Sequence, residues 1–468
     1  MRDYGFGQGK WVFVDWLSIE PGYGTRWPRV GDVSVPLPDG YCVPRGVELR
    51  VHAPDVVPEF CLPLDQPWEK GCAAYATFIE DDGIFRCWYE HGNGLGYAES
   101  DDGIAWRKPT LSLREFAGST ANNLLSFGMH GAGVFIDPSA SATERYKMVG
   151  CLWSPEEKAV IGAVSADGLH WTPLPEPVLR HNHADTQSVC HFDADLGKYV
   201  LYTRQTGGAM QRRGVNRALA EDFKHFATSV PVFECTPLDP PDWDIYCNGY
   251  APWPGATGAH VMRLTMYKHT PDLVDVHLAV SRDGVVWHRP QGQTPWISGG
   301  PSHPAPYPSL YACTGILPTD RGEWSTYLGA AHHAHNEPPE RLTQPAGILR
   351  ARLREDGFMS LSSEAPGECW TIPFVLTSDS IRLNVRTRYG GYVRAALLAS
   401  SGGNTGSETT ANEAIAGYAL ADCRPISGDH LDAPLTWKAG PDLRALRGRT
   451  VRLHLQLFKA NLYALKFE

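Results

Sequence analysis

The pattern Ser-x-Asp-Gly-x-x-Trp occurs three times in this chain, and each copy follows a short apolar run. The copies span residues 100–106, 165–171 and 281–287. In each copy the apolar run predicts a strand, Asp-Gly supplies the backbone angles of a tight turn, and the Trp begins a returning strand. A unit this small cannot bury its own apolar face, so its recurrence predicts sheets that stack on one another. Such sheets arranged radially form a β-propeller around a central channel.

Five similar blocks can be traced along the chain, which predicts five blades. Each block contains an inner strand, a turn, and second and third strands. The inner strands of four blocks are expected near residues 73–79, 133–136, 188–192 and 311–317, and the fourth block runs from Tyr246 through residues 262–267 to Trp287. The repeat of the third block is degenerate, because residues 218–226 keep an Asp but lack the Ser, Gly and Trp. We expect the apolar strand at residues 11–17 to close the ring by pairing with the last blade, which would remove an exposed edge.

The rhythm of the sequence changes after about residue 365. Short alternating strands at residues 381–386, 392–398 and 451–457 surround a stretch rich in Gly, Ser, Asn and Thr at residues 400–410, and a last strand is expected at residues 460–467. This pattern is typical of a β-sandwich. The predicted fold is therefore all-β, with a five-bladed β-propeller over residues 1–365 and a C-terminal β-sandwich over residues 366–468. Sugar binding, covering of a propeller side and dimerisation remain open as roles for the sandwich.

Composition narrows the possible partners. A formal net charge of −10 argues against nucleic-acid binding, because a phosphate footprint needs a basic face. Fifteen Trp and 19 Tyr suit sugar-binding surfaces. No apolar stretch reaches membrane-spanning length, residues 1–7 lack the apolar region of a signal peptide, and the 11 cysteines show no CxxC spacing. We therefore expect a cytoplasmic protein with reduced thiols, no membrane partner and no cofactor, and homo-oligomers remain open.

The blade topology sorts the acidic residues between the two ends of a propeller. Turns between first and second strands lie at one end. Residues that enter the inner strands, or that join second and third strands, lie at the other end, the mouth. The Asp residues of the three repeats, Asp102, Asp167 and Asp283, are expected to be structural hairpin residues. The mouth carboxylates predicted to be catalytic are Asp185, Glu69, Glu90 and Asp244, led by Asp185 and Glu69, which stand directly before inner strands.

Other polar and aromatic residues at the mouth suit a polyhydroxylated ligand. The predicted substrate-binding residues are Trp68, Tyr89, His91, His130, Arg204, Lys268, His332 and Asp15. Carboxylate pairs in such a setting can serve as general acid plus nucleophile or base in glycoside cleavage. His181, His183 and Asp185, with His332, His333 and His335, can also be read as metal ligands, but they lack compact ligand spacing, and no metal is expected.

Several strings resemble bacterial proteins of the glycoside hydrolase family 32 N-terminal-domain-like group. They are Phe-Val-Asp-Trp-Leu-Ser-Ile-Glu at residues 13–20, Pro-Trp-Glu at 67–69, Phe-Arg-Cys-Trp-Tyr at 85–89, residues 97–106, and the ending at residues 435–438, 451–454 and 462–463. The resemblance spans almost the whole chain. It implies a five-bladed propeller related to the family 32, 43 and 68 glycosidases, with one acidic residue from each of the first three blades in a central pocket.

The chain departs from the motifs of those wider families. It has no Asn-Asp-Pro-Asn motif near the N-terminus and no Arg-Asp-Pro motif in blade two. By position the resemblance places Glu69 as the first acid and Asp185 as the third, and it places His130 where the second acid would stand. Glu90 or Asp244 could supply the missing carboxylate. Asp15 matches a recurring Asp of the resembling group, and a structural role on the closing strand fits it equally well.

These observations predict a glycoside hydrolase that acts on a small oligosaccharide or glycoside, with exo cleavage by a carboxylate pair at the propeller axis. Two alternatives use the same residues: a noncatalytic carbohydrate-binding propeller, and a sugar-active lyase in which His130 acts with Tyr89. The carboxylate separation decides the stereochemistry of hydrolysis, because about 5–5.5 Å favours retention and roughly 6.5–9.5 Å favours inversion.

Overall fold

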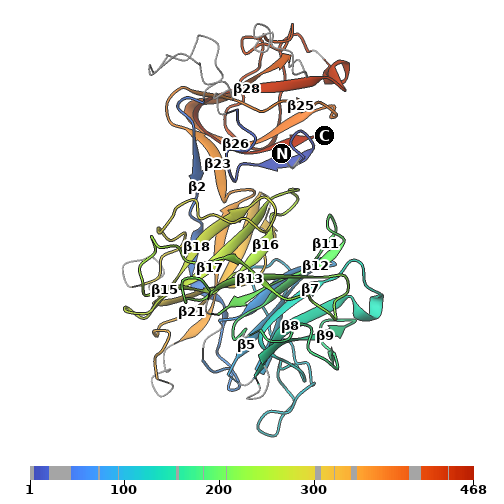
Figure 1. Ribbon diagram of the computed structural model, residues 1–468, viewed down its shortest axis with the longest axis vertical. Helices are drawn as coiled ribbons and strands as arrows, with labels where there is room; N and C mark the ends of the chain where they lie inside the picture. Colours follow the sequence, from blue (N-terminus) through green and yellow to red (C-terminus); the bar gives the residue numbers. More distant parts are fainter. Residues whose placement is uncertain are drawn as a thin grey trace. The chain divides into compact units, whose positions relative to one another are not determined.

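In the computed structural model, the chain forms two compact units (Figure 1). The described residues are 5–20, 44–71, 74–92, 94–153, 158–182, 184–206, 208–300, 307–320, 322–338, 345–399, 413–440 and 442–468. Unit 1 comprises Met1–His52, Trp253–Ala259 and Glu355–Glu468, and unit 2 comprises Ala53–Pro252 and His260–Arg354. The predicted boundary at residue 365 thus differs from this division, in which the first 52 residues group with the C-terminal part.

The described residues are all-β, as the sequence predicts. They contain no α-helix and two short 3-10 helices, η1 (Ala142–Glu144) and η3 (Leu443–Leu446). No helix in this part of the chain has the length and hydropathy needed to span a membrane. Nine described cysteines are free thiols, and eight of them are buried.

The strands of unit 2 form five antiparallel groups in up-and-down order (Figure 1). The first group is β4 (Ala76–Asp81), β5 (Ile84–His91) and β6 (Gly94–Ser100). The second is β7 (His130–Ile136), β8 (Tyr146–Trp153), β9 (Lys158–Ser165) and β10 (Thr172–Pro173). The third is β11 (Val189–Asp193), β12 (Lys198–Gln205), β13 (Gly214–Ala220) and β14 (Val230–Phe233).

The last two groups of unit 2 share one nine-stranded sheet. The fourth group is β15 (Trp243–Cys247), β16 (Tyr250–Pro252), β17 (His260–Lys268) and β18 (Leu273–Ser281). The fifth is β19 (Ser309–Ala312), β20 (Leu317–Asp320), β21 (Glu323–Ala331), β22 (Ala346–Arg354) and β3 (Asp55–Pro63). A parallel pair between Val274 of β18 and Ser309 of β19 joins the two groups.

Neighbouring groups pack in sequence order. β4 packs against β7, β7 against β11, and β13 against β15. The fifth group returns to the first, because β20 contacts β4 and a parallel bridge links Thr77 of β4 to Thr314. Each group therefore has a neighbour on either side.

The strand expected to close the ring lies elsewhere. β1 (Gly9–Val12) pairs with the end of β28 (Thr450–Phe467) in unit 1, where Trp11 and Phe13 are buried in the core. The outer strand of the fifth group is instead β3, which pairs with β22. β3 contains Pro58 and ends at Pro63. Prolines lack the backbone N–H, and they are tolerated in β3 because it is the edge strand of its sheet and has a partner strand on one side only.

The three repeats form the turns that the sequence predicts. In the first copy, Asp102 Oδ1 accepts hydrogen bonds from the amides of Ile104 and Ala105, and Gly103 has φ +69°. The copies at Asp167 and Asp283 have the same bonds, so the prediction that these three acids are structural is confirmed. Backbone N–H donors favour the ionised carboxylate, and they lower the pKa of Asp167 to about 2 against the raising effect of its partial burial.

The glycines of the repeats also tie neighbouring groups together. The carbonyl of Gly103 accepts from the Tyr327 hydroxyl in the fifth group, at 2.6 Å. The Gly168 carbonyl accepts from the Trp88 indole at 2.7 Å, and the Gly284 carbonyl from the Tyr202 hydroxyl at 2.7 Å. The donors lie in β21, β5 and β12, each in the group that packs before the group of its glycine. The repeat therefore serves as a contact between groups as well as a turn.

Unit 1 is built on a single eight-stranded sheet, where the sequence predicts a sandwich of separate short strands. Its remaining strands are β2 (Glu48–Val51), β23 (Met359–Ser363), β24 (Gly367–Trp370), β25 (Phe374–Val375), β26 (Ile381–Ala399) and β27 (Asp429–Pro434). β28 pairs with β1, β23, β24, β25 and β26. Each of the two longest strands, β26 and β28, joins two segments that the sequence analysis treats as separate strands.

A bulge at the middle of β26 explains that difference. Thr387 pairs with Ala460 and Tyr392 pairs with Phe458, so the four residues Arg388–Gly391 lie opposite the single residue Lys459. Lys459 has φ +46° and Gly390 has φ +73°. The positive φ angles and the extra residues interrupt the alternation of the sequence, although the ladder continues on both sides.

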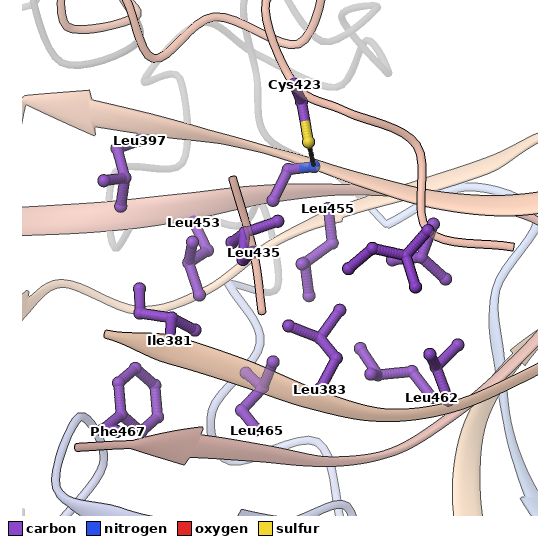
Figure 2. Packing of buried hydrophobic residues seen from close by; sticks show 14 of the residues in the cluster. Ile381, Leu383, Leu397, Cys423, Leu435, Leu453, Leu455, Leu462, Leu465 and Phe467 are labelled. Carbon is purple, nitrogen blue, oxygen red and sulfur yellow. Dashed lines mark hydrogen bonds between the residues drawn. The ribbon is translucent and has the colours of Figure 1, made fainter. Parts of the chain in front are cut away.

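The core of unit 1 lies on one face of these strands. Figure 2 shows Ile381 close to Phe467 and Leu383 close to Leu465, each pair being cross-strand partners in β26 and β28. The Cys423 sulfur points at the same layer and accepts a hydrogen bond from the Ala395 amide at 3.3 Å. Alternate residues on each side of the bulge, Ile381, Leu383 and Val385 and then Val393, Ala395 and Leu397, belong to this core, which is the pattern of a strand with one face on the core.

Candidate functional site

Side chains from all five groups of unit 2 meet in one network. They come from the ends of strands that the sequence analysis assigns to the mouth. The network contains Tyr75 and Glu90 from the first group, His130 from the second, Asp185, Arg204 and Arg213 from the third, Asp244, Tyr246, Tyr267 and His269 from the fourth, and Tyr311 and His335 from the fifth. We call it the central cluster.

Glu90 and His130 form the part of the central cluster between the first two groups. Glu90 lies near the end of β5, and His130 is the first residue of β7. Glu90 Oε1 is 2.7 Å from His130 Nδ1, and Glu90 Oε2 accepts from the Gly131 amide at 2.7 Å. The Glu90 side chain is 22% exposed, so its carboxylate is ordered and still reaches solvent.

The surroundings of His130 limit where its protons lie. His130 Nε2 is 3.2 Å from the backbone carbonyl of Asp185, and a carbonyl oxygen can only accept a hydrogen bond. Nε2 therefore carries a proton. On the other side of the ring, Nδ1 can accept a hydrogen bond from a protonated Glu90 carboxyl or, when it carries a proton itself, donate one to the ionised carboxylate. The geometry therefore allows a proton to pass between Glu90 and His130.

Asp185 lies in an ion pair with Arg204. Its Oδ1 contacts the Arg204 Nη1, and its side chain is 26% exposed while that of Arg204 is 3% exposed. The Arg204 guanidinium also lies 4.7 Å from the centre of the Tyr246 ring. An adjacent cation stabilises the negative charge of a carboxylate. Asp185 is therefore an anchored anion that remains open to solvent.

Asp244, the third carboxylate of the central cluster, is paired with two basic side chains. Its Oδ2 is 3.0 Å from His269 Nε2 and 3.4 Å from Arg213 Nε. Among the described residues its buried Oδ1 has no hydrogen-bond partner. The Arg213 guanidinium lies over the Tyr246 and Tyr267 rings, at 5.3 Å and 6.0 Å. The Asp244 carboxylate is therefore held by two basic side chains.

Aromatic residues complete the central cluster. The Tyr75 hydroxyl lies 3.2 Å from that of Tyr246 and 3.5 Å from the Asp185 carbonyl. The Tyr311 hydroxyl lies 2.5 Å from His335 Nδ1, and the His335 ring meets the Tyr246 ring edge to face at 4.8 Å. Burial lowers the pKa of His335 to about 4 and raises the pKa of Tyr75 well above its usual range. His335 is therefore neutral at pH 7.

Two hollows adjoin the central cluster. One of about 460 Å³ is lined by Tyr75, Glu90 and His130, with Lys70 and Arg114 also on its wall. A second of about 340 Å³ is lined by Trp243, Asp244, His269 and Arg213, among others. Both volumes are at the small end of the range of roughly 300–1,000 Å³ for small-molecule pockets.

Glu69 does not fit the catalytic role predicted for it. Its side chain is 0% exposed. Oε2 accepts from the amides of Asp65 and Gln66, each at 3.0 Å, and from Lys108 Nζ at 2.6 Å, while Oε1 accepts from the Tyr89 hydroxyl at 2.5 Å. A carboxylate enclosed in this way holds the loop before β4 in place.

Two of the predicted aromatic residues belong to the same buried network. Asn123 Nδ2 donates to the Tyr89 hydroxyl at 2.6 Å, and Asn123 Oδ1 accepts from the Trp68 indole at 2.8 Å. Tyr89 is 0% exposed. Direct contact of Tyr89 with a substrate, or its action as the base of a lyase, is incompatible with this burial.

The remaining predicted residues have varied surroundings. His91 is buried but lines the larger hollow, and burial lowers its pKa to about 4. Lys268 is ion-paired with Asp275 and lies over the Trp243 ring. His332 lies 4.4 Å from the Tyr307 ring, and it is His335 that enters the central cluster.

Asp15 lies in unit 1, whereas the central cluster belongs entirely to unit 2. Its Oδ1 accepts from the Leu17 amide at 3.0 Å, which favours the structural alternative for this residue over substrate binding. Of the residues considered as metal ligands, His183 lies outside the described residues. Among the described residues, no group of three or more His, Cys, Asp or Glu side chains is arranged to hold a metal ion.

The sequence analysis overlooked several members of the central cluster. Tyr75 and Tyr246 were read only as strand residues, and Arg213 was not considered. Their position in the sequence could have identified them, because all three lie at the ends of strands that face the mouth. Glu234 was also missed. It follows β14 and accepts from the Gln205 side chain and, at 3.3 Å, from the Ala209 amide.

No protein-family model and no curated protein matches the chain. Solved structures that it resembles include a thermostable family-43 glycoside hydrolase, at 13% identity and TM-score 0.45, over 63% of this chain and 93% of that one. An endo-arabinase from Bacteroides thetaiotaomicron matches at 11% identity and TM-score 0.41, over 63% of this chain and 96% of that one. A structure titled as a glycoside hydrolase of the GH130 family of mannoside phosphorylases, targeting β-1,2 mannosidic linkages in Candida mannan, matches at 15% identity and TM-score 0.38, over 65% and 91%.

Proposed function

We propose that this protein is a glycoside hydrolase that removes sugar units from the ends of short oligosaccharides or glycosides. We further propose that the five groups of unit 2 are the blades of a five-bladed β-propeller. The sequential packing of the groups, with β20 returning to β4, supports this arrangement. So do the hydrogen bonds from Tyr327, Trp88 and Tyr202 to the repeat glycines of the following groups.

The observation that carries the proposal is the placement of Glu90 and Asp185 around His130. Glu90 binds one nitrogen of the imidazole, and the backbone carbonyl of Asp185 binds the other. The two carboxylates have solvent-reaching side chains and different charge environments, since one shares a proton with a histidine and the other contacts an arginine. Two carboxyl groups in unlike environments are what acid–base cleavage of a glycosidic bond requires.

Glu90 is assigned as the general acid. The proton held between Glu90 and His130 passes to the glycosidic oxygen as the bond from that oxygen to the anomeric carbon breaks. The Gly131 amide on Oε2 keeps the carboxylate oriented during this transfer. His130 acts as a positioning residue, because its Nε2 is fixed on the Asp185 carbonyl and its Nδ1 faces the carboxylate.

Asp185 is assigned as the second carboxylate. In an inverting reaction it takes a proton from the water that attacks the anomeric carbon. In a retaining reaction it attacks that carbon itself, and water then cleaves the resulting ester with Glu90 acting as base. Arg204 keeps Asp185 anionic in either case. The anomer formed first, observed by proton NMR, distinguishes the two reactions.

Asp244, His269 and Trp243 are assigned to substrate binding. They line the second hollow, where the Asp244 carboxylate and the His269 imidazole offer polar groups and the Trp243 ring offers an apolar face. Hollows of about 460 and 340 Å³ suit single sugar units better than a long chain. Cleavage at chain ends is therefore the proposed mode.

The test is hydrolysis of a panel of aryl glycosides and short oligosaccharides by the intact protein and by Glu90→Gln and Asp185→Asn. Each substitution removes acid–base chemistry with little change in shape, so we expect turnover to fall about 10²- to 10⁴-fold with unfolding unchanged. Glu80→Gln is the matched control, because Glu80 lies near the end of β4 and its Oε1 accepts from the amide of Gly83 in the turn that follows. Binding of a sugar by the unmutated protein without turnover of any substrate would refute hydrolysis and favour the noncatalytic alternative.

A further inference from the structure

Unit 1 contains a hollow of about 280 Å³ that has no part in the chemistry proposed for unit 2. It lies on the sheet formed by β2, β23, β28 and β26. Its walls include Arg50, Arg386, Arg388, Lys459, Asn461 and Tyr463.

The strand register explains why polar residues gather there. Asn461 of β28 is paired with Ser362 of β23 on one side and with Arg386 of β26 on the other. Residues directly opposite one another in antiparallel strands point to the same face. The neighbouring residues Leu361, Leu462 and Val385 point to the opposite face, where they are buried in the core. The hollow is thus on the polar face of the sheet.

The hollow has an excess of positive charge. Four cationic side chains line it, and Glu364 is the acid among its lining residues. Arg50 is also paired with Glu48, and Arg386 with Asp429 at 3.5 Å, so four cations face three acids. Glu364 is shared, since it accepts from Arg50 at 2.7 Å and is also ion-paired with Arg388. Lys459 forms no ion pair within the described residues, and its ammonium lies 5.2 Å from the Phe458 ring centre. A local cationic excess on a chain of formal net charge −10 favours an anionic ligand.

Two lining residues of the hollow, Asn461 and His52, are joined by a chain of neutral hydrogen-bonding groups that runs through the buried residues Ser362 and Ser360. Ser362 Oγ donates to Asn461 Oδ1 at 2.8 Å, and Ser360 Oγ lies 2.7 Å from Ser362 Oγ. His52 Nε2 lies 2.7 Å from Ser360 Oγ. Burial and the neighbouring Arg50 lower the pKa of His52 to about 4, so this chain is uncharged at pH 7. The chain fixes the Asn461 amide, and this amide and the Tyr463 hydroxyl, which line the hollow, suit the hydroxyls of a sugar.

The bulge of β26 adds an aromatic side chain next to the hollow. Tyr389 follows Arg388 in the bulge and is 99% exposed. Lys459, opposite the bulge, holds φ +46°, a strained conformation for a residue with a side chain. Bulges re-aim side chains and are frequent beside binding sites. An exposed tyrosine beside cations and hydroxyls can stack on a sugar ring.

We propose that this hollow is a binding site for an oligosaccharide that carries carboxylates, that is, one containing uronic acid units. Arg386, Arg388 and Lys459 bind the carboxylate, and the Asn461 and Tyr463 side chains bind ring hydroxyls. Tyr389 packs against the adjacent sugar unit. The site is independent of the reaction proposed for unit 2, so either proposal can fail alone.

The experiment measures binding affinity by isothermal titration calorimetry. The full chain is titrated with a trimer of galacturonic acid and with the fully methyl-esterified trimer. The ester keeps the sugar and removes the charge. We expect the acid form to bind at least about tenfold more tightly at low salt, with the preference reduced by added salt. The double variant Arg388→Gln/Lys459→Gln should lose this preference, whereas Glu90→Gln should retain it.

Arg382→Gln is the matched control, because Arg382 lies on the same strand, β26, and is paired with Asp432 at 2.6 Å. It should bind the acid trimer like the unmutated protein. Equal affinity for acid and ester, absence of binding, or undiminished binding by Arg388→Gln/Lys459→Gln would overturn the proposal. Sodium sulfate that binds as tightly as the acid trimer and displaces it completely would overturn the sugar component, because such a site would recognise charge alone.

Discussion

Replacement of Glu69 by Gln should damage stability far more than chemistry. The carboxylate is fully buried and accepts four hydrogen bonds, three of them on Oε2. A glutamine keeps the size of the side chain but removes its charge. If the glutamine oxygen faces Lys108, the glutamine NH2 group must face the Tyr89 hydroxyl, which already accepts a hydrogen bond from Asn123.

The size of the stability loss depends on the contacts that Lys108 keeps. Removing one partner of a buried ion pair costs about 3–5 kcal/mol. Lys108 is 13% exposed, and its ammonium keeps the Pro63 carbonyl at 2.6 Å and Asp65 at 2.9 Å. These contacts reduce the loss, and we expect Glu69→Gln to lower the free energy of unfolding by about 2–4 kcal/mol.

Urea unfolding, followed by tryptophan fluorescence, measures this loss. Lys108→Met and the double variant Glu69→Gln/Lys108→Met complete a cycle in which the double loss should be smaller than the sum of the single losses. Turnover per folded molecule should stay within about tenfold of the unmutated protein, because Glu69 contacts no solvent. A stability loss below about 1 kcal/mol, together with a rate loss above about 10²-fold, would show that Glu69 acts on the substrate and that our reasoning is wrong.

Three further substitutions test other parts of the structure. Gly131→Ala should abolish turnover, because a Cβ at φ +62° would overlap the Thr186 carbonyl and displace the amide bound to Glu90, whereas Gly118→Ala, at φ +83° with no atom within 4 Å, should leave turnover unchanged. Tyr202→Phe should lower the free energy of unfolding by about 1–2 kcal/mol in urea titrations, since the Gly284 carbonyl loses its donor, and an unchanged midpoint would contradict a contact between groups. His335, with a pKa lowered to about 4 from 6.5 by burial, makes its full contribution above pH 6.5. As pH falls from 6.5 to 4 the unfolded chain binds a proton that the folded chain does not, so stability declines, and His335→Gln should lessen the decline in urea midpoint between pH 7 and 5. An identical decline in both proteins would contradict this assignment.

Local chemistry explains what the sequence could predict. The turn at Asp102 depends on side chain and backbone within a few residues, so the Ser-x-Asp-Gly-x-x-Trp pattern was enough to predict it. The inner strands also follow from local patterns, and β7 and β11 lie close to their predicted positions. The mouth assignment of Glu90, Asp185 and Asp244 came from strand order alone and agrees with the central cluster.

Partners distant in sequence explain what could not be predicted. Position before an inner strand placed Glu69 at the correct end of its strand, but the direction of its side chain depends on Lys108, 39 residues later. The pairing of β3 was hidden by Pro58, which weakens a strand signal unless the edge position is known. Lys459 looked like a break between strands because the bulge that accommodates it lies on another strand.

The pairing of β1 with β28 has a consequence for the order of folding during synthesis. Gly9 pairs with Phe467, so β1 waits for a strand that is translated after every residue of unit 2. Unit 2 consists of Ala53–Pro252 and His260–Arg354 and is complete long before that. Until β28 emerges, the apolar side chains of Trp11 and Phe13 lack their core, and this long wait exposes the nascent chain to aggregation. A ribosome stalled before residue 450 would therefore carry a chain whose first strand has no partner strand in its sheet.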